Sequence, residues 1–276
     1  MKIIACLKVI ADPDIVDFDV VNENLRNLYP AMDPLSYHVL EEGLRLREKH
    51  GGEVTALSVA PEKEEAILRN ALLFGVDRAI RIWNDQLEEA DTFLVSQVLK
   101  GEIRNIGGDL ILCGVRSSDY GSEFMASTLA HSLNIPSATH IVNIEIDNYS
   151  GLTAHKKLQK GGRETYTLKL PAILGLEQGI NEPRYVAPFS KTYNEGRSKK
   201  VEFVEPRSVQ ANPLIAILGY TQSKPRVKVG IDVSALSMEE RLKMMRGELG
   251  GTKVMFEGSP EIAAQKICAQ LNEFLE

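Results

Sequence analysis

The chain has 276 residues, 43% of them hydrophobic and 25% charged, a balance that excludes collagen-like, low-complexity and wholly disordered proteins. With 32 basic and 38 acidic residues the net charge is −6, which argues against a general nucleic-acid binder because phosphate contacts need clustered Lys and Arg. The apolar stretches fall far short of the ~20 residues of a membrane helix. Lys8 interrupts the first of them, so we expect a cytoplasmic protein with no signal peptide and no membrane span.

The first 140 residues alternate apolar runs with amphipathic segments, which is typical of βαβ units that build a parallel sheet. The expected strands are Ile3–Ile10, Val54–Ala60, Ala79–Trp83, Asp109–Gly114 and Thr139–Ile146. The expected helices are a segment that begins at Asp33-Pro34 and closes at Gly51, followed by Pro61–Phe74, Ala90–Ile106 and Ser118–Leu133. Asp is a favoured N-cap, Pro a favoured first helical residue and Gly a favoured stop. The pattern predicts an α/β, Rossmann-like three-layer fold of the adenine nucleotide alpha hydrolase type.

The pattern then changes to three short strands separated by turn sequences, which predicts an antiparallel extension of the sheet. These strands are Ile141–Ile146, Leu152–Leu158 and Glu164–Leu170, with a further apolar run at Ala172–Leu176. From residue 191 the periodicity disappears and prolines accumulate. We therefore divide the chain into a Rossmann-like domain over residues 1–190 and an extended C-terminal arm over residues 191–276, with helices near Ser237–Met245 and at Glu261–Phe274. A long arm without a core of its own needs a surface to lie against, either this domain or a second chain.

Chemistry in an open α/β sheet is expected beyond the carboxyl ends of the strands, where the strand order reverses. The common order places the first strand between the second and the fourth, which selects the loops Lys8–Asp12, Ser58–Pro61 and Gly114–Ser122. The third loop is polar, rich in small residues and followed by a helix, so its N–H groups would favour an anionic or phosphorylated ligand. The alternative is an ordinary strand-to-helix loop with a serine cap.

Motifs for other chemistries are missing from the sequence. No G-x-G-x-x-G opens a helix and no G-x-x-x-x-G-K-[ST] occurs, which disfavours a conventional dinucleotide oxidoreductase and a P-loop NTPase. The cysteines form no C-x-x-C pair and the histidines no H-x-x-x-H pair, so neither a metal site nor a catalytic constellation is expected.

The region from Lys157 to Tyr185 is more specific. Its segments are Lys157-Leu-Gln-Lys-Gly-Gly-Arg-Glu164, Leu168-Lys-Leu-Pro-Ala-Ile-Leu174 and Gly179-Ile-Asn-Glu-Pro-Arg-Tyr185. This order of a basic residue, a Gly-rich turn, Glu, an apolar strand, Pro and then Asn-Glu-Pro-Arg-Tyr closely resembles the diagnostic segment of electron transfer flavoprotein β subunits. Cys6-Leu-Lys8, Met32-Asp-Pro34 and Leu73–Ala79 are also similar to the family, so the resemblance covers residues 1–190.

The resemblance implies one half of a heterodimer with an electron transfer flavoprotein α subunit. Such a pair shuttles electrons through FAD between acyl-CoA dehydrogenase-type or other redox enzymes. The FAD lies chiefly on the α subunit, and the β subunit holds AMP or, in the electron-bifurcating branch, a second FAD. The protein then supplies binding and orientation, and no catalytic side chain is expected in this chain. The alternative is a stand-alone adenine-nucleotide-binding protein of the universal stress type, whose G-x-x-G-x₉-G-[ST] loop is missing here.

By the same resemblance, the nucleotide lies at the three strand ends selected above. The residues expected to line it are Cys6, Asp33, Ser58, Val59, Gly114, Asp119, Tyr120, Gly121, Ser122, Glu123, Phe124 and Met125. Asp33 stands where the family has Asn, and the run from Ser122 to Met125 stands where the family presents polar side chains. Phe124 and Met125 donate no hydrogen bond to a phosphate, and Glu123 would repel one. AMP, a second FAD and no nucleotide at all stay open as alternatives for this divergent or bifurcating-type member.

Four residues are expected at interfaces with other proteins. Lys157 and Arg184 are candidates for fixing the geometry between the subunits, because Arg forms bidentate pairs with carboxylates. Pro188 and Phe189 stand near the position where many family members present a docking leucine, and an aromatic side chain is a favoured interface anchor. The alternatives are solvated strand-end charges for the first pair and packing within the arm for Phe189.

Overall fold

The computed structural model describes residues 1–19, 22, 24–147, 151–206, 213–215, 217–221, 237–245 and 264. It divides into two compact units, Met1–Gln222 and Ser223–Glu276. The second unit contains helix α6 (Met238–Met245), where the sequence predicted a helix near Ser237–Met245. The helix predicted at Glu261–Phe274 lies outside the described residues apart from Ala264. None of the helices in the described ranges combines the length and the apolar character that crossing a bilayer requires.

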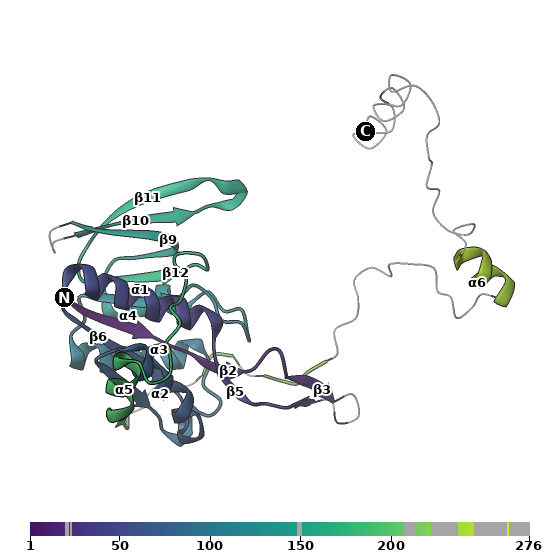
Figure 1. The fold of residues 1–276 in the computed structure, drawn as a ribbon, viewed down its shortest axis with the longest axis horizontal. Helices are drawn as coiled ribbons and strands as arrows, with labels where there is room; N and C mark the ends of the chain where they lie inside the picture. The colour runs from purple at the N-terminus through teal and green to yellow at the C-terminus, as the bar shows by residue number, and fades with distance from the viewer. Residues whose placement is uncertain are drawn as a thin grey trace. The chain divides into compact units, whose positions relative to one another are not determined.

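A nine-stranded sheet forms the centre of the first unit (Figure 1). Its strands are β1 (Lys2–Cys6), β6 (Glu53–Val59), β7 (Arg78–Ile82), β8 (Leu110–Gly114), β9 (Ser137–Asp147), β10 (Gly151–Lys157), β11 (Arg163–Lys169), β12 (Ala172–Leu176) and β13 (Glu202–Val204). They lie in the order β11-β10-β9-β12-β8-β1-β6-β7-β13. All neighbours run parallel except β9-β10-β11, which form an antiparallel meander. The predicted parallel sheet with an antiparallel extension is confirmed.

Helices cover both faces of the sheet and make three layers. They are α1 (Pro34–His50), α2 (Glu65–Phe74), α3 (Thr92–Ile106) and α4 (Met125–Leu133), with single 3-10 turns η1 (Glu62–Glu64), η2 (Asp85–Leu87) and η3 (Gln159–Gly161). The apolar residues of α1 and α2 join one core, and those of α3 and α4 join the other. Ile3 and Ile4 of β1 enter opposite cores, because successive side chains of a strand point to opposite faces. The predicted three-layer Rossmann-like architecture is confirmed.

Helix ends follow the expected signals except at α4. The Asp33 carboxylate caps α1 by accepting the Leu35 N–H at 2.9 Å, and Gly75 ends α2 in the left-handed conformation. The helix predicted from Ser118 begins only at Met125. The N–H of Ser118 donates to Asp33 at 2.7 Å, and Gly121 adopts a φ of 64°. These two features hold residues 115–124 as a loop.

A projection of two small antiparallel sheets follows β1 (Figure 1). It pairs β2 (Val9–Ala11) with β5 (Pro30–Met32) and β3 (Asp17–Asp19) with β4 (Asn24–Arg26). The single strand predicted at Ile3–Ile10 is therefore divided in two. The division falls at Lys8, whose N–H donates to Ser36 Oγ at 3.0 Å and whose carbonyl accepts from Asp33 N–H at 3.0 Å, which turns the chain onto the start of α1.

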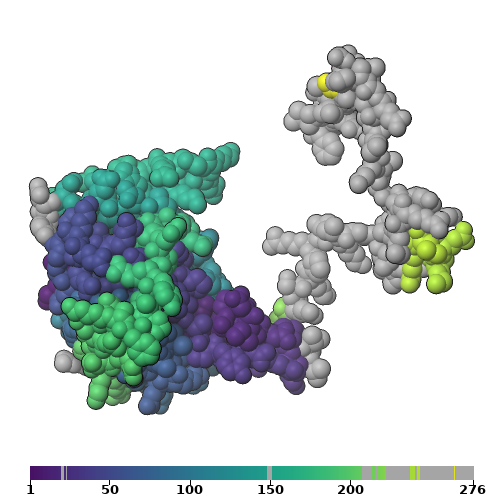
Figure 2. Space-filling view, in the orientation of Figure 1, coloured from purple at the N-terminus to yellow at the C-terminus, as the bar shows by residue number. Residues whose placement is uncertain are grey.

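The first part of the predicted arm is regular structure on the body of the first unit. Helix α5 (Lys191–Ser198) packs against α2, and a Cβ on Gly196 would lie 2.2 Å from the Leu72 carbonyl oxygen, so only glycine permits this approach. Strand β13 extends the sheet beside β7, with the Phe203 ring 4.6 Å from the Arg81 guanidinium. Figure 2 shows α5, in green, on the surface of the body. The structure thus differs from an extended arm over residues 191–204.

Candidate functional site

The carboxyl ends of three neighbouring strands bring the three expected loops together. β1 lies between β6 and β8, and the chain order moves outward in opposite directions on its two sides. This is the reversal point at which open α/β sheets bind ligands. The candidate site is therefore formed by Leu7–Lys8, Ser58–Ala60 and the loop over residues 115–124.

Asp33 shapes this site from within. One carboxylate oxygen accepts the Leu35 N–H, and the other accepts the Ser118 N–H at 2.7 Å. Gly114 lets β8 pass close to α1, since a Cβ there would lie 3.1 Å from the Leu35 Cβ. Both oxygens of the buried Asp33 side chain thus accept hydrogen bonds from backbone N–H groups of this chain, and these bonds fix the loop against α1.

An ion pair crosses the mouth of the site. Lys8 Nζ lies 2.7 Å from Asp119, and its ammonium lies 5.1 Å from the centre of the exposed Tyr120 ring. Burial alone would raise the pKa of Asp119, but the Lys8 ammonium, the nearby Ser117 hydroxyl and the Tyr120 N–H together hold that pKa below its ordinary value. The Ser117 hydroxyl is buried and lies close to the carboxylate without a hydrogen bond of good geometry. Lys8 is neutralised by a carboxylate of its own chain.

The inner wall is apolar apart from one hydroxyl. Cys6 and Cys113 are buried side by side, and their contact together with burial raises the pKa of the Cys113 thiol, which stays protonated. Val59 packs against the second core. Ser58 is 1% exposed, and its hydroxyl has no hydrogen-bond partner. A buried hydroxyl without a partner is costly, so the role predicted for Ser58 at a ligand is compatible with this geometry and stays a prediction.

The run of residues before α4 offers a ligand backbone N–H groups rather than side-chain donors. The Ser122 hydroxyl accepts from Thr92 at 3.1 Å, and Met125 packs against the second core. Phe124 stands at the N-cap position and is exposed, and no side chain caps the helix. The first N–H groups of α4 are therefore open to an anion at the positive end of the helix dipole.

A charged group that the sequence did not predict lies beside this run. His140 Nδ1 lies 2.9 Å from Glu177, and the Arg116 guanidinium lies 3.8 Å from the same carboxylate. On its other side His140 lies 3.8 Å from Glu123. His140 adopts a φ of 59°, where the pairing of β9 with β12 shifts register, and no sequence pattern signals this. Arg116, like Lys8, has a carboxylate beside it, so a phosphate here would depend on backbone N–H groups.

The Asn-Glu-Pro-Arg segment binds α1 of its own chain. Arg184 reaches Glu41 at 2.7 Å and Glu48 at 2.6 Å. The Asn181 amide donates to the His38 carbonyl at 3.0 Å and to the buried Glu42 carboxylate at 2.9 Å. These bonds fasten the chain after β12 to the helix that carries the Asp33 cap. A contact of Arg184 with a second chain stays a prediction, as does one of Lys157, which lies exposed at the end of β10.

Phe189 stands out from the surface, next to the exposed Pro188. Its side chain is 77% exposed, and its ring lies 6.2 Å from that of Tyr193. Its φ of 65° is strained for a bulky residue. The Asn194 amide donates to the Phe189 carbonyl at 2.9 Å, and Ser190 caps α5 directly behind it. The backbone at Phe189 is thus held in place, and its aromatic side chain lies exposed.

A second apolar surface lies on segment 213–221. The N–H groups of Leu214 and Ile215 donate to Asp91 Oδ2 at 2.6 and 3.1 Å, while the other oxygen of Asp91 caps α3. Further along, burial and the neighbouring Tyr220 raise the pKa of the Tyr120 hydroxyl. The segment therefore runs from the start of α3 toward the mouth of the site. Its large aliphatic side chains are all exposed: Leu214, Ile215, Ile217 and Leu218.

Comparison with known proteins gives this arrangement a family. The model of the electron transfer flavoprotein domain matches residues 29–208, which is more than half of the chain. The chain belongs to the electron transfer flavoprotein family. The resemblance read from the sequence is therefore confirmed.

Curated relatives specify the subunit. The chain is 39% identical over 155 residues to the electron transfer flavoprotein subunit beta of Bacillus subtilis, an alignment that covers 56% of this chain and 60% of that protein. It is 28% identical over 240 residues to the subunit beta of Methylophilus methylotrophus, covering 85% and 83%. Protein FixA of Azotobacter vinelandii is 32% identical over 197 residues, covering 67% and 68%. The chain is an electron transfer flavoprotein β subunit, and it spans less than two thirds of the B. subtilis relative.

Proposed function

We propose that this β subunit pairs with an electron transfer flavoprotein α subunit as a cytoplasmic heterodimer that carries electrons between redox enzymes. The observation that carries the proposal is the set of exposed aliphatic side chains Leu214, Ile215, Ile217 and Leu218, of which Leu218 is 99% exposed. A run of this kind on a free protein is an aggregation hazard, and its Asp91 anchor holds it in place for a partner. The packing of residues 223–276 on the α subunit stays a prediction, and most of these residues lie outside the described ranges.

We further propose that the candidate site holds the AMP moiety, either free or as part of a second FAD. The Ser58 hydroxyl without a partner and the uncapped start of α4 both fit such a ligand. The paired Lys8 and Arg116 and the Glu123 carboxylate do not favour a phosphate, so backbone N–H groups would bind it. Among the predicted lining residues, Tyr120 offers a ring, while Cys6, Val59 and Gly114 shape the wall.

Electron transfer itself belongs to the cofactor. FAD bound chiefly to the α subunit would supply the redox chemistry, and the residues of this chain would supply binding and orientation. In this chain the Asp33 bonds and the Arg184 clamp keep the site and α1 in one rigid piece. We propose that Phe189 then anchors an acyl-CoA dehydrogenase-type or other redox enzyme, because a preordered aromatic side chain loses little entropy on docking.

Co-expression with an electron transfer flavoprotein α subunit from the same source tests the proposal. We expect a 1:1 complex by light scattering, a flavin absorbance band, and AMP or extra FAD released on denaturation. Leu218→Asp should weaken the complex, while Leu218→Met, which keeps an apolar side chain, should not. A stable, flavin-free monomer that does not bind the α subunit and releases ATP on denaturation would overturn the proposal. It would indicate a stand-alone nucleotide-binding protein instead.

A further inference from the structure

The turn of the β10–β11 hairpin concentrates positive charge on an acidic chain. Four of the eight residues from 156 to 163 are Lys or Arg and none is Asp or Glu, whereas the whole chain has a net charge of −6. Figure 2 shows the hairpin, in teal, as a ridge that projects from the body. Three of these cations, Lys157, Lys160 and Arg163, are exposed, and together they form what we call the basic tip.

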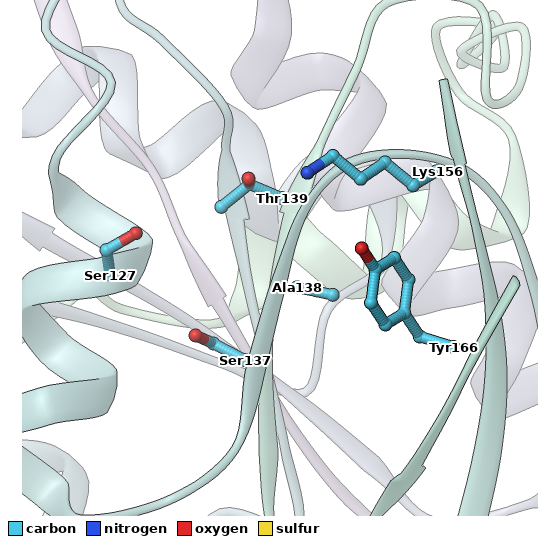
Figure 3. A pocket seen from close by; sticks show the side chains of 6 residues that line it. All are labelled: Ser127, Ser137, Ala138, Thr139, Lys156 and Tyr166. Atoms are coloured by element: carbon cyan, nitrogen blue, oxygen red, sulfur yellow. The ribbon is translucent and has the colours of Figure 1, made fainter. Parts of the chain in front are cut away.

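The basic tip and the carboxylate that follows the turn lie on different faces of the hairpin. Lys157 and Arg163 stand directly opposite each other in the β10–β11 register, so their side chains leave the same face. Lys156 and Glu164 form the next pair and leave the other face, because successive side chains of a strand alternate. Figure 3 shows Lys156 there together with Tyr166, whose hydroxyl donates to Glu164 at 2.6 Å. Glu164 therefore belongs to the face away from Lys157 and Arg163.

The charge of the basic tip is not compensated within the described part of the chain. None of its three cations forms an ion pair with a described residue. On the face that Lys157 shares, Glu145 lies 3.8 Å from His155. Glu145 stands opposite Thr153, four residues from Lys157, which is about 13 Å along the strand at ~3.3 Å per residue.

Two of these cations also weaken the hairpin that carries them. Like charges that stand directly opposite each other in an antiparallel pair are destabilising, and Lys157 and Arg163 form such a pair. Lys160 adopts a φ of 60° and a ψ of 21°, a left-handed conformation in which glycine would fit at lower cost. The turn is closed all the same by the Leu158 N–H, which donates to the Gly162 carbonyl at 2.8 Å. Positions that disfavour the fold in this way are typical of residues that act on a partner.

The chemistry of the basic tip fits a transient partner rather than a permanent one. Permanent interfaces are rich in apolar area, which on this chain is exposed on segment 213–221. Exposed charges instead speed the encounter of two proteins whose charges are complementary, and they leave the complex free to dissociate. We propose that the basic tip docks a carboxylate-rich surface of the redox enzyme with which this protein exchanges electrons. This inference rests on the proposed function, and it adds the surface used and the charge that the partner presents.

Electron transfer into the heterodimer tests the docking. An acyl-CoA dehydrogenase from the same source reduces the flavin, and the second-order rate constant is measured at about 10 mM and about 1 M ionic strength, where charges act over about 30 Å and about 3 Å. Lys160→Gly combined with Arg163→Thr should lower the rate constant about threefold to tenfold at low salt and leave it equal to wild type at high salt. Lys49→Gln combined with Arg104→Gln removes the same charge from exposed positions on α1 and α3 and should change the rate constant less than about twofold.

Stability and pairing separate docking from a structural role. Because glycine fits the left-handed turn and no like charge then faces Lys157, the tip variant should unfold at an equal or higher urea concentration than wild type. A lower unfolding midpoint, an unchanged rate constant, or equal slowing by both double variants would each overturn the proposal. Loss of pairing with the α subunit in light scattering would also overturn it, because the basic tip would then belong to the permanent interface.

Failure of the proposed function gives a different result. A dehydrogenase that does not reduce even the wild-type heterodimer would contradict that function and leave the charge of the partner to a second measurement. Amide chemical shifts of the full-length chain are then followed as a deca-glutamate peptide is added. We expect shifts centred on residues 157–163, and shifts that are absent or centred elsewhere would overturn the basic tip as a docking site for carboxylates.

Discussion

Replacing Asn181 by alanine tests how the Asn-Glu-Pro-Arg segment holds the fold. The change removes the hydrogen bond to the His38 carbonyl and the one to the Glu42 carboxylate, both at the junction of α1 with the chain after β12. A neutral bond contributes about 0.5–1.5 kcal/mol and a bond to a charged group about 1.5–3 kcal/mol. We therefore expect the free energy of unfolding of the isolated chain to fall by about 2–4 kcal/mol at pH 7.

The pH dependence of this loss identifies its cause. Burial already raises the pKa of Glu42, and the Asn181 amide is the largest influence that opposes the rise. Without that amide the pKa rises further, so the charged form costs more stability at neutral pH. Below the unfolded-state pKa of about 4.3 the carboxyl is protonated in both states, and this part of the loss disappears. The deficit of Asn181→Ala should therefore shrink as the pH falls from 7 toward 5.

Urea unfolding followed by circular dichroism measures the effect. Asn143→Ala is the matched control, because that amide also donates to a carboxylate, Glu145, but on the exposed surface, and it should cost less than about 0.5 kcal/mol. Glu42→Gln in the Asn181→Ala background should recover part of the loss, since it removes the buried charge. A loss equal to that of the control, or one that does not change with pH, would refute the structural role of the segment.

Three further changes probe the loops and the strand that frame the site. Asp119→Asn removes the ion pair with Lys8 and should lower the free energy of unfolding by about 0.5–1 kcal/mol at pH 7. Because the pKa of Asp119 is lowered in the folded protein, the difference from wild type should vanish as acid protonates the carboxylate. Identical urea unfolding curves at pH 7 would contradict this expectation. Phe203→Ala removes the ring stacked on a buried guanidinium and should speed amide exchange in β13 but not in β6; unchanged exchange in β13 would mean that the backbone pairing alone holds the strand. Asp91→Asn keeps a good helix cap but weakens the charge-assisted bonds to segment 213–221, so proteases should cut that segment faster while α3 keeps its protection.

The sequence predicted most of the architecture because local signals and the fold agree. Asp33-Pro34 begins α1 and Gly75 ends α2 where capping chemistry predicts. The meander follows from its two turn sequences, since turns of few residues permit only antiparallel neighbours. Each of these signals depends on residues within one turn or one strand, which a sequence displays directly.

The remaining features depend on contacts between distant residues. Helix α5 has no apolar stripe; it exists because Ser190 caps it and Gly196 fits against the Leu72 carbonyl. Met125, rather than Ser118, begins α4 because the Ser118 N–H is taken by Asp33, 85 residues earlier. No window of sequence contains both partners of such a bond, so propensity alone misplaces these elements.

The segment that identifies the family and the loop that selects a ligand are different residues with different tasks. Asn181 and Arg184 make the resemblance recognisable, and their side chains are occupied by carboxylates of α1. Asn181 and Arg184 are therefore evidence for the fold and for the position of α1. The proposed ligand would meet the Ser58 hydroxyl and the run from Ser122 to Met125, and that run departs from the family pattern. The clamp holds α1 and, through Asp33, the backbone of that loop, but its own side chains are not among the residues expected at the ligand. The presence of the clamp therefore predicts the fold, and the nucleotide released from this chain identifies the ligand.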